Sequence, residues 1–326
     1  MLEAPTGADD VDPEPTDAQW ERLSVVPERR SMFAYDMYFR ECWADAAATW
    51  GERVMAVASS VAVLMLKPDA VVGRRAGPVL DFVAGHGLRP VACRTTRLTR
   101  HSMRELYRYD WHIYPVDRLA FSTFWYTTDD VVAFVLEDVA PERGLPASVR
   151  LSGLKGSTPE ARQPWHLRSV LAPPNRILNF VHVTDEPADL FREIGILLDR
   201  DDRRALLTEV AASLGSDRGA DVRRDVAALE ARVPAHDLDL ERSLRRLAAV
   251  PAVGPGPVDE VAAGLAAGRS FAWDELRALL HPDAPGVDRW DFICVASHAI
   301  EAERDVPAEM LPPVNRAAWA ERELAR

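Results

Sequence analysis

The sequence comprises 326 residues, which at the usual domain size is enough for two or three structural units. Hydrophobic residues make up 48% of it, which argues against a wholly disordered chain, and the net charge of −12 argues against nucleic-acid binding as the main function. The three cysteines (Cys42, Cys93, Cys294) lie far apart without a CxxC pair, so neither a disulfide framework nor a structural zinc site is expected.

Two further features bear on where the protein works. Its first residues are acidic and contain proline, whereas a secretory signal peptide begins with basic residues. The longest apolar run, at 54–66, is interrupted by serines and is too short to span a bilayer. With the cysteine usage, these features predict a cytoplasmic protein that has no membrane or nucleic-acid partner.

Along the chain, residues 1–18 are acidic and predict a disordered leader. Residues 19–59 are rich in aromatic side chains and predict a helical N-terminal extension. Residues 60–200 alternate between strand and helix patterns and predict a domain of their own. Residues 201–326 carry Leu, Ala and Arg at helical spacing and predict an all-helical C-terminal domain, in which we assign no site.

The central segment opens with a continuous apolar run that predicts a buried strand. Thr99 stands where the N-cap of a later helix belongs, because Met103, Leu106 and Tyr107 share one helical face after it. The predicted strands are 61–66, 89–98, 131–136 and 177–183, and the other predicted helices are 76–85, 116–125 and 186–198. This order is that of a ferredoxin-like α+β fold, an antiparallel or mixed sheet with helices on one face.

The common catalytic signatures are missing from the sequence. There is no GxGxxG after a strand, no HExxH and no GxSxG, and GLKGST at 153–158 lacks the spacing of a P-loop. Candidate chemistry lies instead in LKPDA at 66–70 and NFVHVTD at 179–185, both at predicted strand ends. Strand alternation puts Asn179 and His182 on opposite faces, so a bend would be needed for both to face one pocket.

Lysine is rare in this chain, since only two of its 39 basic residues, Lys67 and Lys155, are lysines. Arginine occupies the other basic positions. Where lysine persists against that bias, a compact ammonium can be required in place of a planar guanidinium. Lys67 belongs to the LKPDA segment, which adds to the interest of that strand end.

Both strand-end segments are similar to motifs of the nucleoside diphosphate kinase family. LKPDA resembles the lysine-proline-aspartate segment on the family's first strand, and NFVHVTD resembles its NxxHGSD motif, which contains the phosphorylated histidine. Further family segments are resembled, in the family's order, by GLRPVACRTTRLTRHSMRELY, DVVAFVLED, STPEARQPWHLR and FREIGILL. The resemblance covers residues 60–200.

The resemblance implies a role for each matching residue. A neutral His182 would attack the γ-phosphate of ATP or another nucleoside triphosphate and form a phosphohistidine, splitting one transfer into two steps. Glu193 would hold the other ring nitrogen, and Tyr107 would help to position His182. The implied phosphate- and nucleotide-binding residues are Lys67, Thr158, Arg168, Asn179, Arg150, Arg176 and Tyr114, with His112 a weaker alternative to Tyr114 for stacking on the base.

The resemblance also implies the cofactor and the partners. Mg²⁺ would arrive with the nucleotide phosphates, so no protein metal site is expected. The expected partners are nucleotides, and a homo-oligomer is possible.

The sequence departs from the family pattern around the nucleotide. Val183 replaces the glycine that follows the histidine, and Leu178 replaces an arginine beside the asparagine. Residues 169–174 replace the family's GDF segment, and Arg150 is offset from the family's second phosphate-binding arginine. The loop near the nucleotide is therefore remodelled around a phosphotransfer core that resembles the family.

Three functions are compatible with these observations. The first is general nucleoside diphosphate kinase activity through a phosphohistidine. The second keeps this chemistry but sends the phosphoryl group to a dedicated small-molecule or protein acceptor, as the altered loop and the added helical domain suggest. The third is a non-catalytic nucleotide-binding or scaffolding module, which Val183 and the lost GDF segment motivate.

Overall fold

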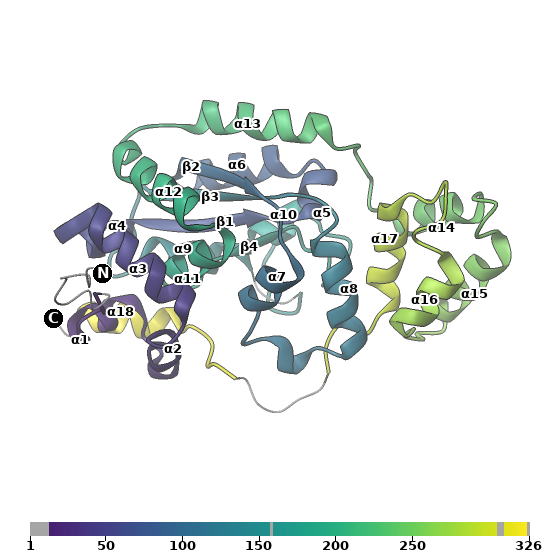
Figure 1. The fold of residues 1–326 in the computed structure, drawn as a ribbon, viewed down its shortest axis with the longest axis horizontal. Coiled ribbons are helices and arrows are strands. Elements are labelled where there is room, and N and C mark those ends of the chain that lie inside the picture. The colour runs from purple at the N-terminus through teal and green to yellow at the C-terminus, as the bar shows by residue number, and fades with distance from the viewer. Residues whose placement is uncertain (1–12, 157–158, 305–309, 325–326) are drawn as a thin grey trace, which may run out of the picture.

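A four-stranded antiparallel sheet forms the centre of the protein (Figure 1). The structure, a computed structural model, describes residues 13–156, 159–304 and 310–324. The strand order is β2-β3-β1-β4, with the strands β1 (Val61–Leu66), β2 (Leu88–Thr96), β3 (Val131–Asp138) and β4 (Val181–Val183). All pairs of neighbouring strands are antiparallel.

Helices separate these strands and another follows β4, but those at 68–72, 147–155 and 167–171 have no counterpart among the helices predicted with bounds. The helices are α5 (Pro68–Val72), α6 (Ala76–Gly85), α7 (Arg100–Leu106), α8 (Val116–Tyr126), α9 (Ala147–Lys155), α10 (Leu167–Leu171) and α11 (Pro187–Leu197). Thr99 caps α7 as expected, because its side chain accepts a hydrogen bond from the backbone N–H of Ser102. The mixed α/β class with a ferredoxin-like sheet is thereby confirmed, and the sheet is antiparallel.

Helices cover both faces of the sheet, not one face as expected. All six residues of β1 are buried, which requires a layer on each side because successive side chains point to opposite faces. Helices α4 (Val54–Ser60), α9 and α11 contact β1, whereas α6, α12 (Arg200–Ser213) and α13 (Gly219–Arg232) contact β2. The additional cover comes from segments outside the predicted central domain.

The segment after residue 200 divides into parts with different neighbours. Helices α12 and α13 pack with the sheet, and Arg203 of α12 pairs with Asp45 of α3 (Met37–Trp50) at 2.7 Å. Figure 1 shows a group of later helices at one end of the molecule: α14 (Leu240–Ala248), α15 (Pro255–Ala266), α16 (Trp273–Leu280) and α17 (Arg289–Ala299). The chain then returns, and α18 (Arg316–Leu324) packs on α9.

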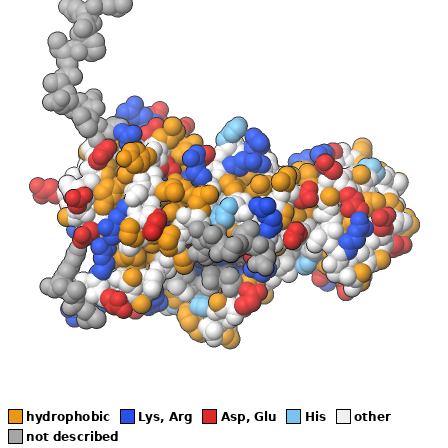
Figure 2. All heavy atoms as spheres, turned by 90° about the horizontal axis from the view of Figure 1, so that it is seen from below, with side chains coloured by type: hydrophobic (Ala, Val, Ile, Leu, Met, Phe, Trp, Pro, Cys, Tyr) orange, Lys and Arg blue, Asp and Glu red, His pale blue; other side chains and the backbone are white. Residues whose placement is uncertain are grey.

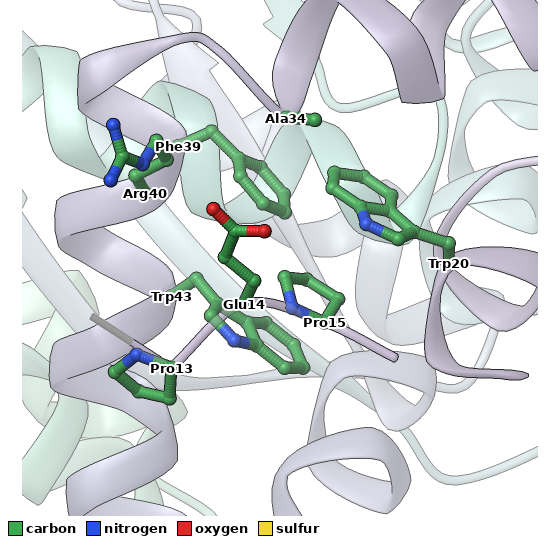
Figure 3. A pocket seen from close by; sticks show the side chains of 8 residues that line it. All are labelled: Pro13, Glu14, Pro15, Trp20, Ala34, Phe39, Arg40 and Trp43. Carbon is green, nitrogen blue, oxygen red and sulfur yellow. The ribbon is translucent and has the colours of Figure 1, made fainter. Parts of the chain in front are cut away.

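The N-terminal segment is helical in its described part. It contains α1 (Asp17–Leu23), α2 (Pro27–Phe33), α3, a 3₁₀ turn (Gly51–Arg53) and α4. Most of the expected leader, residues 1–12, lies outside the described residues, and α1 begins at Asp17. Figure 3 shows Glu14 and Pro15 among the rings of Trp20, Phe39 and Trp43, around a cavity of about 10 Å³.

Helix α11 is fixed at its N-terminus by both flanking regions. The carboxylate of Glu186, its N-cap residue, accepts hydrogen bonds from the N–H of Val25 (2.8 Å) and from the indole of Trp319 in α18 (3.1 Å). Arg29 of α2 donates to both carboxylate oxygens of Asp189 at 2.6 Å. The added segments therefore hold the helix that carries Glu193.

One face of the protein shows a mixed charge pattern. Acidic and basic side chains are intermingled on the face seen in Figure 2, without a broad field of one sign. None of the helices in the described part of the chain has the length and apolarity needed to cross a bilayer.

Gly195 tests how closely the N-terminal extension packs on α11. A Cβ atom at this position would lie 2.3 Å from the carbonyl oxygen of Tyr38 in α3, and a backbone atom cannot move aside cheaply. We expect Gly195→Ala to lower the free energy of unfolding by about 1–3 kcal/mol in urea denaturation. Gly77→Ala is the control, because no atom lies within 4 Å of its added Cβ, and a change below about 1 kcal/mol is expected. Equal effects of the two substitutions would contradict this packing.

Candidate functional site

The two candidate segments meet where β1 ends. Lys67 follows the last residue of β1, and Pro68 then starts α5, which stops the strand. The backbone N–H of Lys67 donates to the carbonyl oxygen of Phe180 at 2.9 Å, and Thr184 pairs with Val63 through backbone and side chain. These bonds place β4 beside the end of β1.

A left-handed residue supplies the bend that the sequence requires. Phe180 has φ of +69°, a conformation that an aromatic residue rarely adopts. Its N–H donates at 2.9 Å to the carboxylate of Asp69, which is fully buried. The predicted strand at 177–183 is accordingly shortened to Val181–Val183, and Asn179 and His182 come to line the same cavity.

Lys67 is a buried cation held by polar and aromatic groups. Its ammonium donates to the side-chain oxygen of Asn179 and, at 3.4 Å, to the carbonyl oxygen of Ile177. The same ammonium lies 4.8 Å from the centre of the Trp125 ring. Burial lowers the pKa of Lys67 to about 7, although the neighbouring Asp69 acts in the opposite direction.

His182 is oriented by a carboxylate. Its Nε2 lies 2.8 Å from Oε1 of Glu193, whose side chain is 8% exposed. An ionised carboxylate can only accept, so Nε2 carries a proton, and in the neutral ring the lone pair is on Nδ1. No hydrogen bond to Nδ1 is found among the residues that the structure describes, and the side chain is 19% exposed. The geometry therefore holds the imidazole by Nε2 and leaves Nδ1 available.

Tyr107 lies against His182 in the wall of the same cavity. Its ring meets the His182 ring edge-on, with centroids 5.4 Å apart, and its hydroxyl is 2.6 Å from that of Tyr126. Burial raises the pKa of both hydroxyls, so both tyrosines remain neutral. Tyr107 thus restrains the imidazole without adding a charge.

A cavity of about 360 Å³ opens in front of these groups, and we call it the basic cavity. Its acidic side chains are Asp110 and Glu303. Its basic side chains outnumber these and come from separate parts of the chain: Lys67, Arg118, Arg162, Arg168 and Arg176. Such a surplus of cations in a concave site favours an anionic ligand.

A second, larger cavity of about 520 Å³ also reaches His182, and we call it the mixed cavity. It shares Asp110, Ile113 and His182 with the basic cavity. Its charged side chains have both signs, and Lys155 in its wall lies 3.3 Å from the carboxylate of Asp185. Both lysines of the chain therefore line a cavity that contains His182.

Most of the other predicted residues join the basic cavity. Arg168 donates to the carbonyl oxygen of Val181 at 2.9 Å, and Arg176 pairs with Glu303 at 2.9 Å. Tyr114 lines this cavity, whereas His112 lines the mixed one. Thr158 lies outside the described residues.

Arg150 does not join the others. Its guanidinium bonds to the carboxylate of Asp138 at 2.8 Å and to the carbonyl oxygen of His86, and it lines neither cavity. In the sequence, Arg150 lies near the position of the family's second phosphate-binding arginine. In the structure, the buried carboxylate at the end of β3 pairs with it instead.

Val183 does not cover the histidine. Because side chains alternate along β4, Val183 points away from His182 and is fully buried opposite Leu64. The bulk that replaces the family's glycine is therefore accommodated in the core.

Several cavity residues escape the sequence analysis. Arg118 does leave a signal, because it shares the apolar stripe of α8 with Phe121, Ser122 and Trp125. Glu303 leaves none, since it comes from a distant segment that folds back beside Arg176. Arg162 lies in a segment that resembles the family and Tyr126 directly follows a predicted helix, but their proximity to Lys67 depends on the tertiary fold.

The pKa of Lys67 predicts how anion binding changes with pH. As pH rises through about 7 the ammonium loses its proton, so the affinity for sulfate, whose charge is constant in this range, should fall between pH 7 and 9. The fall is limited to about tenfold per pH unit. In Lys67→Arg the charge persists, so calorimetric titration should give a much flatter profile. Parallel profiles for the two proteins would contradict this role of Lys67.

Comparisons with known proteins give matches to solved structures alone. No protein-family model matches the sequence, and no curated protein matches it. The nucleoside diphosphate kinase of Aquifex aeolicus is similar in structure with a TM-score of 0.35 and 24% identity, over 43% of this chain and 95% of that one.

Two further solved structures are similar to this chain at 18% identity. An NDP kinase from Pyrobaculum aerophilum has a TM-score of 0.33 and is matched over 44% of this chain and 97% of that one. The nucleoside diphosphate kinase of Encephalitozoon cuniculi has a TM-score of 0.36, over 44% and 90% respectively.

Proposed function

We propose that the basic cavity is the active site of a phosphotransferase that works through a phosphohistidine at His182. One observation carries the proposal: Glu193 accepts a hydrogen bond from Nε2 of His182 at 2.8 Å and leaves Nδ1 available beside a cavity rich in cations. A neutral imidazole oriented in this way is a competent nucleophile toward phosphorus.

In the first step, the Nδ1 lone pair attacks the γ-phosphorus of a nucleoside triphosphate. The N–P bond forms while the bond to the bridging oxygen breaks, and the nucleoside diphosphate leaves with that electron pair. Positive charge on the phosphorylated imidazole is balanced by Glu193, which keeps its bond to Nε2. Lys67 and Arg168 lie where they can neutralise charge on the phosphate oxygens.

In the second step, a phosphate oxygen of an acceptor nucleoside diphosphate attacks the phosphorus, and Nδ1 recovers its lone pair. This acceptor is already ionised, so the step requires no general base. Mg²⁺ would be held by the nucleotide phosphates, because the cavity offers few carboxylates and many cations.

A dedicated acceptor is the second candidate, and the mixed cavity favours it. This cavity reaches His182, is larger than the basic one, and contains both acidic and basic side chains. An acceptor other than a nucleoside diphosphate could approach from there. The same phosphohistidine would serve both reactions.

Labelling with γ-³²P ATP and Mg²⁺ tests the proposal. We expect an acid-labile, alkali-stable label on the wild-type protein and none on His182→Ala. Glu193→Gln should slow labelling by about 10- to 100-fold, because the ring loses the partner that fixes its tautomer. His101→Ala is the matched control, since this exposed histidine lies on α7 outside both cavities and should label normally.

The chase separates the candidate functions. Removal of the label by several nucleoside diphosphates supports general nucleoside diphosphate kinase activity, whereas a label that resists this chase supports a dedicated acceptor. Nucleotide binding without any label would leave a non-catalytic binding module. Equal labelling of wild type and His182→Ala would refute the phosphohistidine.

A further inference from the structure

Arg118 is a buried guanidinium in the wall of the basic cavity. Its side chain projects from α8, and the residue is 8% exposed. The guanidinium carbon lies 5.4 Å from the ring centre of Tyr114 and 5.9 Å from those of Phe121 and Trp125. The arginine is thus enclosed by aromatic rings on a helix that faces the cavity.

The charge of Arg118 has no carboxylate partner in the described ranges of the chain. Its hydrogen bond goes to the hydroxyl of Ser122, and its Nε is buried without a hydrogen-bond partner. Burial lowers the pKa of Arg118, which reflects the cost of keeping this charge away from water. A buried cation of this kind calls for an anion.

Other buried arginines of the same protein meet that requirement. Arg29, Arg192 and Arg203 are comparably buried, and each pairs with an aspartate at 2.6 or 2.7 Å. Arg118 differs from them because it lines the basic cavity. An anionic ligand in this cavity would therefore supply the counter-charge that Arg118 lacks.

Lys67 adds a second positive charge close to that of Arg118. Its ammonium and the guanidinium of Arg118 both lie against the ring of Trp125, at 4.8 and 5.9 Å from the ring centre. Aromatic faces attract cations, but they do not cancel the repulsion between two of them. An anion bound between Lys67 and Arg118 would relieve it.

The contacts of Tyr114 point to the same kind of ligand. The guanidinium of Arg118 lies over this ring, and Trp111 meets it edge-on with centroids 5.7 Å apart. These contacts use ring surface that stacking on a nucleobase would need. Tyr114 is therefore better suited to positioning Arg118 than to recognising a base.

We propose that Arg118 and Lys67 form a phosphate-binding subsite, and that the basic cavity recognises a linear polyphosphate chain more than the nucleoside attached to it. The ligand class is a chain of three phosphates, whether inorganic tripolyphosphate or the triphosphate of a nucleotide. The inference concerns the cavity of the proposed phosphotransferase, but binding at this subsite does not require transfer to His182.

Calorimetric titration of the His182→Ala protein tests the subsite without turnover. We expect tripolyphosphate and ATP to bind with affinities within about tenfold of each other and adenosine not to bind detectably, since charged contacts dominate. Adding Arg118→Met should weaken both phosphate ligands at least about tenfold, whereas Arg118→Lys should retain part of the affinity. Strong binding of adenosine alone would overturn the proposal.

Arg289→Met is the matched control. Its guanidinium also lies over an aromatic ring of α8, 5.2 Å from the centre of Phe124, but it does not line the basic cavity. It should leave the affinity for tripolyphosphate unchanged. Similar losses in Arg118→Met and Arg289→Met would count against a specific subsite.

Thermal unfolding distinguishes a binding role from a structural one. Arg118→Met removes a buried charge and keeps an unbranched apolar side chain at this position, so the midpoint without ligand should stay the same or rise, and tripolyphosphate should no longer raise it. A purely structural arginine would instead lower the midpoint when it is replaced. If Arg118→Met loses tripolyphosphate binding but the wild type shows no histidine label, the subsite stands and the phosphotransferase is rejected. If the wild type is labelled but Arg118→Met keeps its affinity for tripolyphosphate, the phosphotransferase stands and the subsite is rejected.

Discussion

The candidate site depends on the left-handed turn at Phe180. Side chains along a regular strand would send Asn179 and His182 to opposite faces, and a positive φ at Phe180 brings both into the basic cavity. A conformation of this kind costs about 1–2 kcal/mol for a residue with a side chain, so the surroundings must enforce it. The buried carboxylate of Asp69 does so, because it accepts the Phe180 N–H.

This constraint explains why LKPDA and NFVHVTD act as one unit. Lys67 closes the turn through its backbone N–H to Phe180, and its ammonium binds the side chain of Asn179. The segment that supplies the cation thus also fixes the residues leading to the histidine. The second constraint comes from α11, which presents Glu193 and is anchored by Arg29 and Trp319 from opposite ends of the chain.

The flanking regions therefore help to position the residues of the site. Arg192, next to Glu193, pairs with Asp36 at the N-cap of α3 and donates to the carbonyl oxygen of Glu105 in α7, the helix that precedes Tyr107. The guanidinium of Arg192 thus joins the N-terminal extension to α7 and α11, the helices that position Tyr107 and Glu193 beside His182. We infer that the extension helps to maintain the spacing of Tyr107, His182 and Glu193.

The sequence predicts the elements well where periodicity or capping is strong. The apolar run of β1 and the cap at Thr99 could be anticipated in this way, whereas the pairing of His182 with Glu193 is what the family resemblance implies. The length of β4 could not, because it depends on a hydrogen bond from Phe180 to Asp69, which is distant in sequence.

The role of a charged side chain is harder to predict from sequence, because its ion-pair partner is often distant along the chain. Arg150 forms an ion pair with Asp138, and Glu303 pairs with Arg176 from a segment far along the chain. The helical patterns after residue 200 likewise do not reveal that α12 and α13 cover the sheet while later helices form a separate group. Arg118 is the exception, since a charge within an apolar stripe is visible in the sequence of α8.

The most direct test of the account is to identify which ring nitrogen carries the phosphoryl group. The protein can be labelled with ¹⁵N-histidine, phosphorylated with ATP and Mg²⁺, and examined by ¹⁵N and ³¹P NMR. Because Glu193 holds Nε2, the account predicts phosphorus bonded to Nδ1 of His182. Phosphorus on Nε2, or on a residue other than His182, would contradict it.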